Sequence, residues 1–173
     1  MIKLLNILKE IESEKKYTIY CDMDGVLSDF DKQLEIYTGI KNGRSWEKKH
    51  GTPAFWDEID VGGLKFWSEM PWMSDGKKLW SYLKGRKNLS ILSAPARTLP
   101  NSVNGKYIWC KKNLGNVRVI LRQADEKQQF AAPNSILIDD YERNISQWKA
   151  KGGIPILHKN AADTISQLKK LGL

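Results

Sequence analysis

Short apolar runs alternate with segments of helical periodicity along this chain, and this alternation constrains the fold more than any other feature. The apolar runs cover residues 17–23, 89–93, 117–121, 135–139 and 154–157. Helical patterns follow over about 74–83, 104–114, 141–151 and 160–171, and in the second of these we expect Ile108 and Trp109 to face inward. Buried strands separated by helices are typical of a parallel sheet with helices on both faces. The sequence therefore predicts an α/β fold with a parallel sheet.

The stretch from residue 31 to residue 74 does not follow this alternation of strands and helices. It shows no strong period and no repeat, yet it holds four of the seven tryptophans together with several glycines and prolines. We predict a small aromatic-rich cap at 31–74, inserted into a core formed by 1–30 and 75–173. Most of its aromatic side chains should form the core of the cap, because aromatic residues dominate small cores. Residues 1–16 show an amphipathic pattern and are predicted to form a docking helix.

The charge and the cysteine content indicate which cellular compartment and which binding partners to expect. The net charge is +8, and residues 75–130 hold 12 Lys and Arg against 3 Asp and Glu, an excess of +9. Such a segment attracts anions, which include phosphates, nucleotides and nucleic acid. No apolar run approaches the roughly 18 residues needed to span a bilayer. With two cysteines only, a disulfide scaffold is improbable, and a cytoplasmic protein with no membrane partner is expected.

Two pairs of acidic residues end predicted strands. Asp22 and Asp24 close the first strand, and Asp139 and Asp140 close the fourth. Ligands bind at the carboxyl ends of parallel strands, where adjacent strands would bring both pairs together. Carboxylates packed in this way repel one another, so a hard cation is the natural partner, and oxygen ligands favour Mg²⁺ over Zn²⁺. Gly25 permits a tight turn that brings the backbone close to a bound group.

A hydroxyl and an ammonium group complete the set of polar strand ends. Ser93 ends the second strand, and Lys127 lies just beyond the third. These groups suit the oxygens of a phosphoryl group. Together with a metal and a carboxylate nucleophile, they form a physically adequate site for phosphate monoester hydrolysis.

In the order and spacing of these residues, the sequence resembles the haloacid dehalogenase-like (HAD) superfamily of phosphatases. The run from Asp22 to Leu27 matches its first motif, Ser93 the second, Lys127 the third and the pair Asp139-Asp140 the fourth. The resemblance covers nearly the whole chain after residue 16. It implies a Rossmann-like three-layer core with a cap inserted after the first strand.

The same resemblance implies a mechanism and a set of site residues. Asp22 would attack phosphorus to form an aspartyl-phosphate, and Asp24 would protonate the leaving oxygen and then activate water. Mg²⁺ would be held by Asp22, Asp139 and the backbone carbonyl of Asp24, with Asp140 in support. Phosphate would be bound by Ser93, Ala94 and Lys127, with Ala94 standing where a hydroxyl residue is usual.

A narrower similarity is to 5′(3′)-deoxyribonucleotidases. It rests on the run from Asp22 to Phe30, on Ser93-Ala94-Pro95 and on the segment Lys106-Tyr107-Ile108-Trp109. It implies that Phe30, Phe55 and Trp56 hold the base of a small deoxyribonucleotide. Two alternatives stay open: a phosphatase that acts on polynucleotide ends, and a nucleic-acid-binding protein that keeps the fold without catalysis. A sugar-phosphate phosphatase would share the chemistry of the leading hypothesis.

Overall fold

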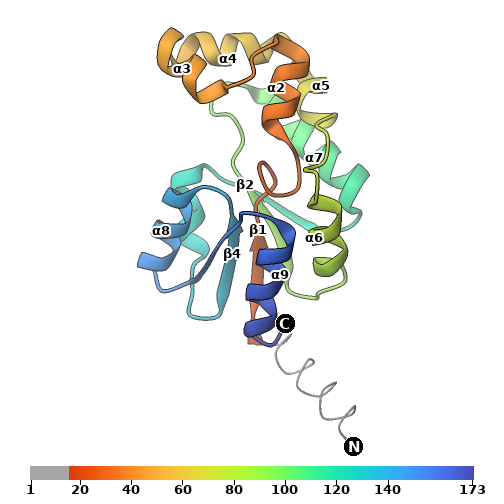
Figure 1. Ribbon diagram of the computed structural model, residues 1–173, viewed down its shortest axis with the longest axis vertical. Helices are drawn as coiled ribbons and strands as arrows, with labels where there is room; N and C mark the ends of the chain where they lie inside the picture. Colours follow the sequence, from red (N-terminus) through yellow and green to blue (C-terminus); the bar gives the residue numbers. More distant parts are fainter. Residues whose placement is uncertain (1–15) are drawn as a thin grey trace, which may run out of the picture.

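A parallel β-sheet forms the centre of the protein, whose computed structural model describes residues 16–173 (Figure 1). Within that range the sheet has five strands in the order β3-β2-β1-β4-β5, all paired in parallel. The strands are β1 (Thr18–Cys21), β2 (Leu89–Ser93), β3 (Arg118–Leu121), β4 (Ser135–Asp139) and β5 (Ile154–Leu157). The predicted α/β class and strands are confirmed, and β1 ends before Asp22. The helix predicted for residues 1–16 falls on a segment outside the described residues, apart from Lys16.

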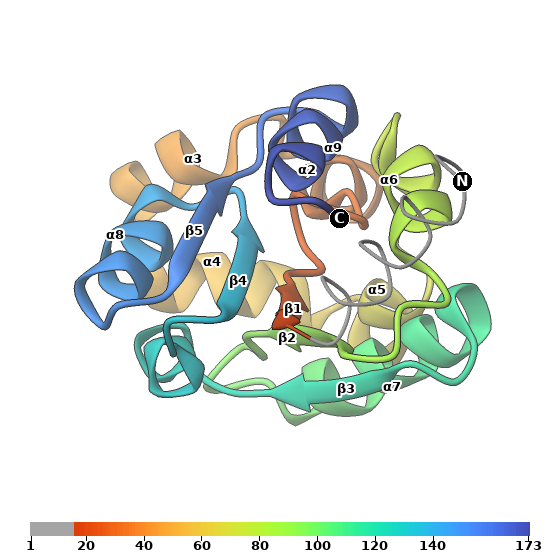
Figure 2. The same ribbon diagram turned by 90° about the horizontal axis from the view of Figure 1, so that it is seen from below.

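Helices cover both faces of this sheet, as the predicted three-layer arrangement requires. Helices α6 (Gly76–Leu83), α7 (Pro100–Leu114) and α9 (Ala161–Lys170) pack on one face, where Ile19, Ile91 and Ile136 point. Helix α8 (Glu142–Ala150) and the 3₁₀ helix η1 (Ala124–Phe130) cover the other face, around Leu92, Leu137 and Trp148. Figure 2 shows α8 on one side of the sheet and α6 and α9 on the other. Alternation of side chains along each strand produces these two apolar layers.

Helix α7 corrects one sequence-based expectation. It begins at Pro100, earlier than predicted, and proline suits a first helical turn because it needs no backbone donor there. Trp109 is fully buried as expected, but Ile108 is 46% exposed. The prediction for Ile108 was wrong because the buried stripe of the helix passes through Ser102, Gly105, Lys106, Trp109, Cys110 and Leu114.

Four helices form a layer above the carboxyl ends of the strands (Figure 1). They are α2 (Phe30–Thr38), α3 (Gly43–His50), α4 (Thr52–Asp60) and α5 (Gly63–Ser68), and they occupy the stretch predicted to be a cap. The chain enters and leaves this layer through two segments that hydrogen-bond to each other. Asp29 N donates to Pro71 O at 2.8 Å, and Met73 N donates to Leu27 O at 2.8 Å. These bonds fix the base of the cap directly beyond Asp22 and Asp24.

The cap packs closely on α7. Gly105 lies where α5 crosses, and a Cβ at this position would overlap the Cβ of Trp67. Trp109 extends the contact, because its indole Nε1 donates to Met70 O at 2.7 Å. A glycine in the middle of a helix costs stability, and here it allows two helices to approach.

Cys21 and Cys110 are both buried and free. Among residues 16–173, no helix is long and apolar enough to cross a membrane.

Candidate active site

The strand register brings the two acidic pairs together. β1 pairs with β4 so that Cys21 lies opposite Ile138, and each strand continues into an aspartate at its carboxyl end. The backbone N–H of Asp22 still donates to Ile138 O at 2.8 Å. Carboxylate oxygens of Asp22, Asp139 and Asp140 all lie within 4.8 Å of one another. The expected clustering is therefore found for Asp22, Asp139 and Asp140, whereas the carboxylate of Asp24 is not part of this group.

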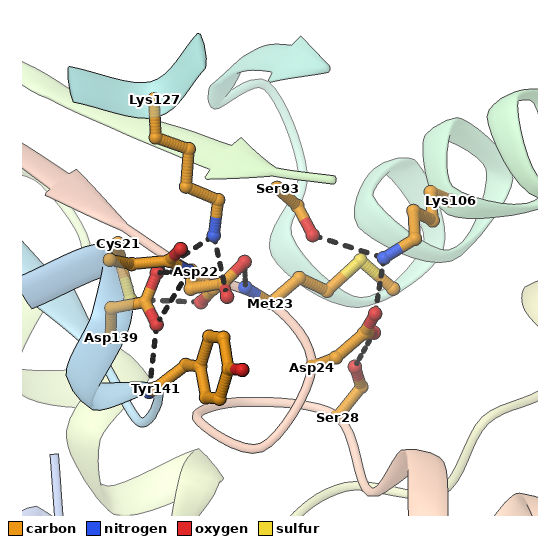
Figure 3. A network of polar contacts seen from close by, with 11 residues as sticks. Cys21, Asp22, Met23, Asp24, Ser28, Ser93, Lys106, Lys127, Asp139 and Tyr141 are labelled. Atoms are coloured by element: carbon orange, nitrogen blue, oxygen red, sulfur yellow. Dashed lines mark hydrogen bonds and ion pairs between the residues drawn. The ribbon is translucent and has the colours of Figure 1, made fainter. Parts of the chain in front are cut away.

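Lys127 lies between two of these carboxylates (Figure 3). Its Nζ is 2.7 Å from Asp22 Oδ2 and 2.8 Å from Asp139 Oδ2, and the side chain is almost fully buried on η1. Burial alone would lower the pKa of Lys127, but the negative charges of Asp22 and Asp139 outweigh it and raise the pKa above its usual range. The ammonium group therefore stays charged at neutral pH, and its contact with Asp22 Oδ2 fixes the orientation of that carboxylate.

Asp139 accepts several hydrogen bonds, yet its carboxylate is buried beside a second carboxylate. It accepts hydrogen bonds from the backbone N–H of Tyr141 at 2.9 Å and from the amide of Asn144 at 3.0 and 3.1 Å. Burial and the charge of Asp22 nevertheless raise the pKa of Asp139 to about 6, against the lowering effect of Lys127. Burial and the charges of Asp22 and Asp139 raise the pKa of Asp140 to about 7.

This donor set fits a magnesium ion. Asp22, Asp139 and Asp140 offer only oxygen ligands, which Mg²⁺ prefers. Their combined negative charge exceeds the single positive charge of Lys127, so a cation would relieve the repulsion among them. The participation of the Asp24 carbonyl, which the family resemblance implies, stays a prediction.

The Asp24 carboxylate points away from the cluster, toward α7. Its Oδ2 is paired with the ammonium group of Lys106, and its Oδ1 accepts a hydrogen bond from Ser28 Oγ at 3.0 Å. Lys106 Nζ also donates to Ser93 Oγ at 3.0 Å (Figure 3). Ser93 is 1% exposed and lies behind Ala94, which lines the cavity above the site.

Sequence reasoning gave Lys106 no role of its own in the site. The available signal was its place on α7, three residues before Trp109 and four before Cys110, on a stripe of buried residues. A lysine on an apolar helix face needs a buried partner, because an isolated buried charge is strongly unfavourable. That partner, Asp24, lies 82 positions away in the sequence.

Gly25 has the role expected for a tight turn. Its φ of +73° is strained for residues with a side chain. A Cβ at this position would also overlap the carboxylate of Asp140. The loop after β1 can therefore close over the acidic cluster only with glycine at this position.

A cavity of about 610 Å³ lies between the acidic cluster and the cap. Asp22 and Asp24 form part of its wall, and Phe30, Phe55 and Trp56 line it from the cap side. Phe30 and Trp56 are half-buried, whereas Phe55 is 5% exposed and packs edge-on against Trp56 with ring centroids 5.2 Å apart. The other residues of the wall include Arg44 and Trp67 from the cap and Arg97, Asp140 and Tyr141 from the core.

The acidic cluster predicts a pH dependence of stability. Without divalent cations, the folded protein retains protons on Asp139 and Asp140 that an unfolded chain releases near pH 3.8. The folded state thus binds more protons than the unfolded state up to about pH 7, so the free energy of unfolding should fall as pH rises through this window. Mg²⁺ binds the ionised carboxylates, so the rise in Tm that it causes should be small near pH 5 and large near pH 8.

Thermal unfolding with and without Mg²⁺ across this pH range measures both effects. Asp140→Asn removes one of the two raised groups and should flatten the fall in stability without Mg²⁺. A Tm increase of the same size at both ends of the range would contradict the assignment of the cation to this cluster.

Solved structures of several hydrolases have a fold similar to that of this chain. A hydrolase from Streptococcus pneumoniae TIGR4 has a TM-score of 0.55 at 13% identity, with 89% of this chain and 99% of that chain covered. A haloacid dehalogenase-like family hydrolase from Streptococcus pneumoniae has a TM-score of 0.53 at 15% identity, covering 88% and 91%. A HAD hydrolase from Bacillus subtilis, bound to magnesium, has a TM-score of 0.50 at 14% identity, covering 80% and 85%.

Comparisons of sequence give no further assignment. No family model matches the chain, and no curated protein matches it. At the identities found among the solved structures, the likeness concerns the fold, which is that of HAD hydrolases.

Proposed function

We propose that this protein is a Mg²⁺-dependent phosphomonoesterase that acts through an aspartyl-phosphate on Asp22. The observation that carries the proposal is the position of Asp22 in the wall of the cavity beneath the cap. Its Oδ2 is fixed by Lys127, and its Oδ1 accepts a hydrogen bond from Met23 N at 2.7 Å. Asp24 lies in the same wall, two residues further along the chain. An oriented carboxylate beside a second carboxyl group is the arrangement that nucleophilic and acid–base catalysis need.

The reaction follows from these two residues in two steps. An oxygen of the Asp22 carboxylate attacks phosphorus and forms the acyl phosphate, while the ester oxygen leaves with its bonding electrons and takes a proton from the Asp24 carboxyl group. A water molecule then attacks phosphorus and gives a proton to Asp24. Asp22 leaves as a carboxylate, and inorganic phosphate is released. The ammonium group of Lys127 lies beside Asp22 throughout and stabilises negative charge on the transferring group.

Mg²⁺ bound by Asp22, Asp139 and Asp140 would supply positive charge that offsets the repulsion between the phosphoryl oxygens and the carboxylates. The fold neighbour from Bacillus subtilis is bound to magnesium, which supports this choice of ion.

We further propose a small nucleotide, such as a deoxyribonucleotide, as the substrate. A cavity of about 610 Å³ with several aromatic side chains in its wall is of the size that encloses a small organic ligand. The positive segment 75–130 gives less support to polynucleotide ends than its charge suggests. Two of its cations, Lys106 and Lys127, are buried in the site and paired with Asp24, Asp22 and Asp139.

A substrate screen with Mg²⁺ tests the proposal. We expect phosphate release from deoxyribonucleoside monophosphates at a higher kcat/KM than from sugar phosphates or from oligonucleotides phosphorylated at either end. Faster turnover of the oligonucleotides would favour the polynucleotide alternative, and absence of phosphate release from every ester would refute the phosphatase assignment.

Stacking in the cavity predicts a substrate-specific effect of Trp56→Ala and Phe30→Ala. A base held against an aromatic face gains roughly 1–3 kcal/mol, so loss of one ring should raise KM for a nucleotide about tenfold. KM for nitrophenyl phosphate should hardly change, because Asp22 and Asp24 remain in place. Tyr107→Ala, an exposed aromatic on α7 outside the cavity wall, is the matched control. Equal losses on both substrates would mean that these rings only pack the cap.

A further inference from the structure

We propose that Lys106 is a positioning residue that holds the Asp24 carboxyl group in the orientation for proton transfer to the leaving oxygen. This inference rests on the proposed phosphatase activity. Lys106 comes from helix α7 and not from the end of a strand, unlike the acidic and phosphate-binding residues predicted from the sequence. Its side chain is fully buried, so it does not reach the cavity. Its effect on the reaction must therefore pass through its neighbours.

The contacts of Asp24 show how this positioning works. Each oxygen of the Asp24 carboxylate has its own donor, with Lys106 on Oδ2 and Ser28 on Oδ1. Two donors on opposite oxygens fix both the direction of the side chain and the plane of the carboxyl group. Asp24 keeps 26% of its side-chain surface exposed, so it can still meet a substrate in the cavity.

The ammonium group of Lys106 is itself fixed on three sides. It donates to Ser93 Oγ at 3.0 Å, pairs with Asp24, and lies 5.8 Å from the ring centroid of Trp67. These contacts come from β2, from the loop after β1 and from cap helix α5. An aromatic face attracts a cation, and this contact helps to hold the ammonium group in its place beside Asp24.

The packing of α7 against α5 explains how a cap residue comes into contact with Lys106. Gly105 lets α5 approach until Trp67 covers the adjacent Lys106. Without this lysine, Asp24 would keep Ser28 as a partner and would be free to turn toward water. Misorientation of a catalytic group by small distances can cost orders of magnitude in rate.

Lys106→Met tests the inference through the dependence of the rate on the leaving group. Glycerol phosphate releases a poor leaving group that needs a proton, whereas nitrophenyl phosphate releases a stable phenolate that does not. Single-turnover release of glycerol or nitrophenol reports the first step alone. We expect the rate for glycerol phosphate to fall about 100-fold or more, the lower range for general acid catalysis, and the rate for nitrophenyl phosphate to stay within about threefold.

A second comparison separates positioning from general damage. In an Asp24→Asn background, Lys106→Met should cause no further loss on glycerol phosphate, because the group that it positions has already lost its proton-transfer role. Lys112→Met, an exposed lysine of the same helix, is the control and should leave both rates unchanged. Equal losses on both esters, or a loss that adds to that of Asp24→Asn, would overturn the inference.

Folding and activity are checked separately. Near-ultraviolet circular dichroism reports whether Lys106→Met folds, and Lys106→Gln, which keeps a donor for Asp24, replaces it if it does not. With Lys106→Gln, a smaller loss confined to glycerol phosphate supports the inference, and equal losses on both esters refute it. A wild-type protein that releases no phosphate from any ester, nucleotides included, would refute the proposed function first, and the role of Lys106 with it.

Discussion

Replacement of Asp22 by asparagine is expected to lower phosphate monoester turnover by about 10⁴-fold or more, the scale seen when a catalytic nucleophile is lost. The amide has nearly the same shape as the carboxylate but is a poor nucleophile and a weaker metal ligand. The fold should survive, since the amide oxygen can still accept from Lys127, which lies 2.7 Å from Asp22 Oδ2 in the wild-type protein. Turnover at saturating Mg²⁺ measures the effect.

Two further measurements make this expectation specific to the nucleophile. Wild-type protein quenched in acid during turnover should carry one phosphoryl group, detectable by mass spectrometry, and the Asp22→Asn protein should carry none. Asp57→Asn, an exposed aspartate of cap helix α4, is the control and should retain full activity. Turnover of the Asp22→Asn variant within about tenfold of wild type would rule out a covalent role for this residue.

The sheet and the acidic cluster follow from the sequence because both depend on local signals. Each strand is a short apolar run, and parallel strands place their carboxyl ends at one edge. Asp22 and Asp139 follow two such runs directly, so their proximity needs only the assumption that β1 and β4 are neighbours. A place for Lys127 beside these strand ends was also predicted, although its position in the 3₁₀ helix η1 was not.

Lys106 and the interior of the cap depend on tertiary packing and could not be predicted in the same way. The cap stretch showed no strong period, because its four short helices bury only a few residues each. Ile108 was placed on the wrong face of α7, since an apolar pair at 108–109 looks like core until Gly105 and Lys106 are known to face inward. The sequence pattern therefore identifies the chemistry of the strand ends better than the contacts that orient it.

Loss of the ammonium group at position 127 should cost stability as well as activity. Lys127→Met leaves Asp22 and Asp139 buried side by side without their shared cation. Breaking a buried ion pair by removing one partner costs about 3–5 kcal/mol, and we expect the free energy of unfolding at neutral pH without Mg²⁺ to fall by about this amount. Urea unfolding measures it, with Lys112→Met, an exposed lysine of α7, as the control.

The condition dependence of this loss identifies its cause. Near pH 5 the penalty should shrink, because Asp139, whose pKa is already raised to about 6 in the wild-type protein, takes up a proton more readily once Lys127 is absent. Mg²⁺ should restore part of the lost stability, since the ion supplies positive charge to the same carboxylates, but it should not restore turnover, because the contact that orients Asp22 is missing. A stability loss equal at both pH values and unaffected by Mg²⁺ would instead mean that Lys127 only fills space in the core.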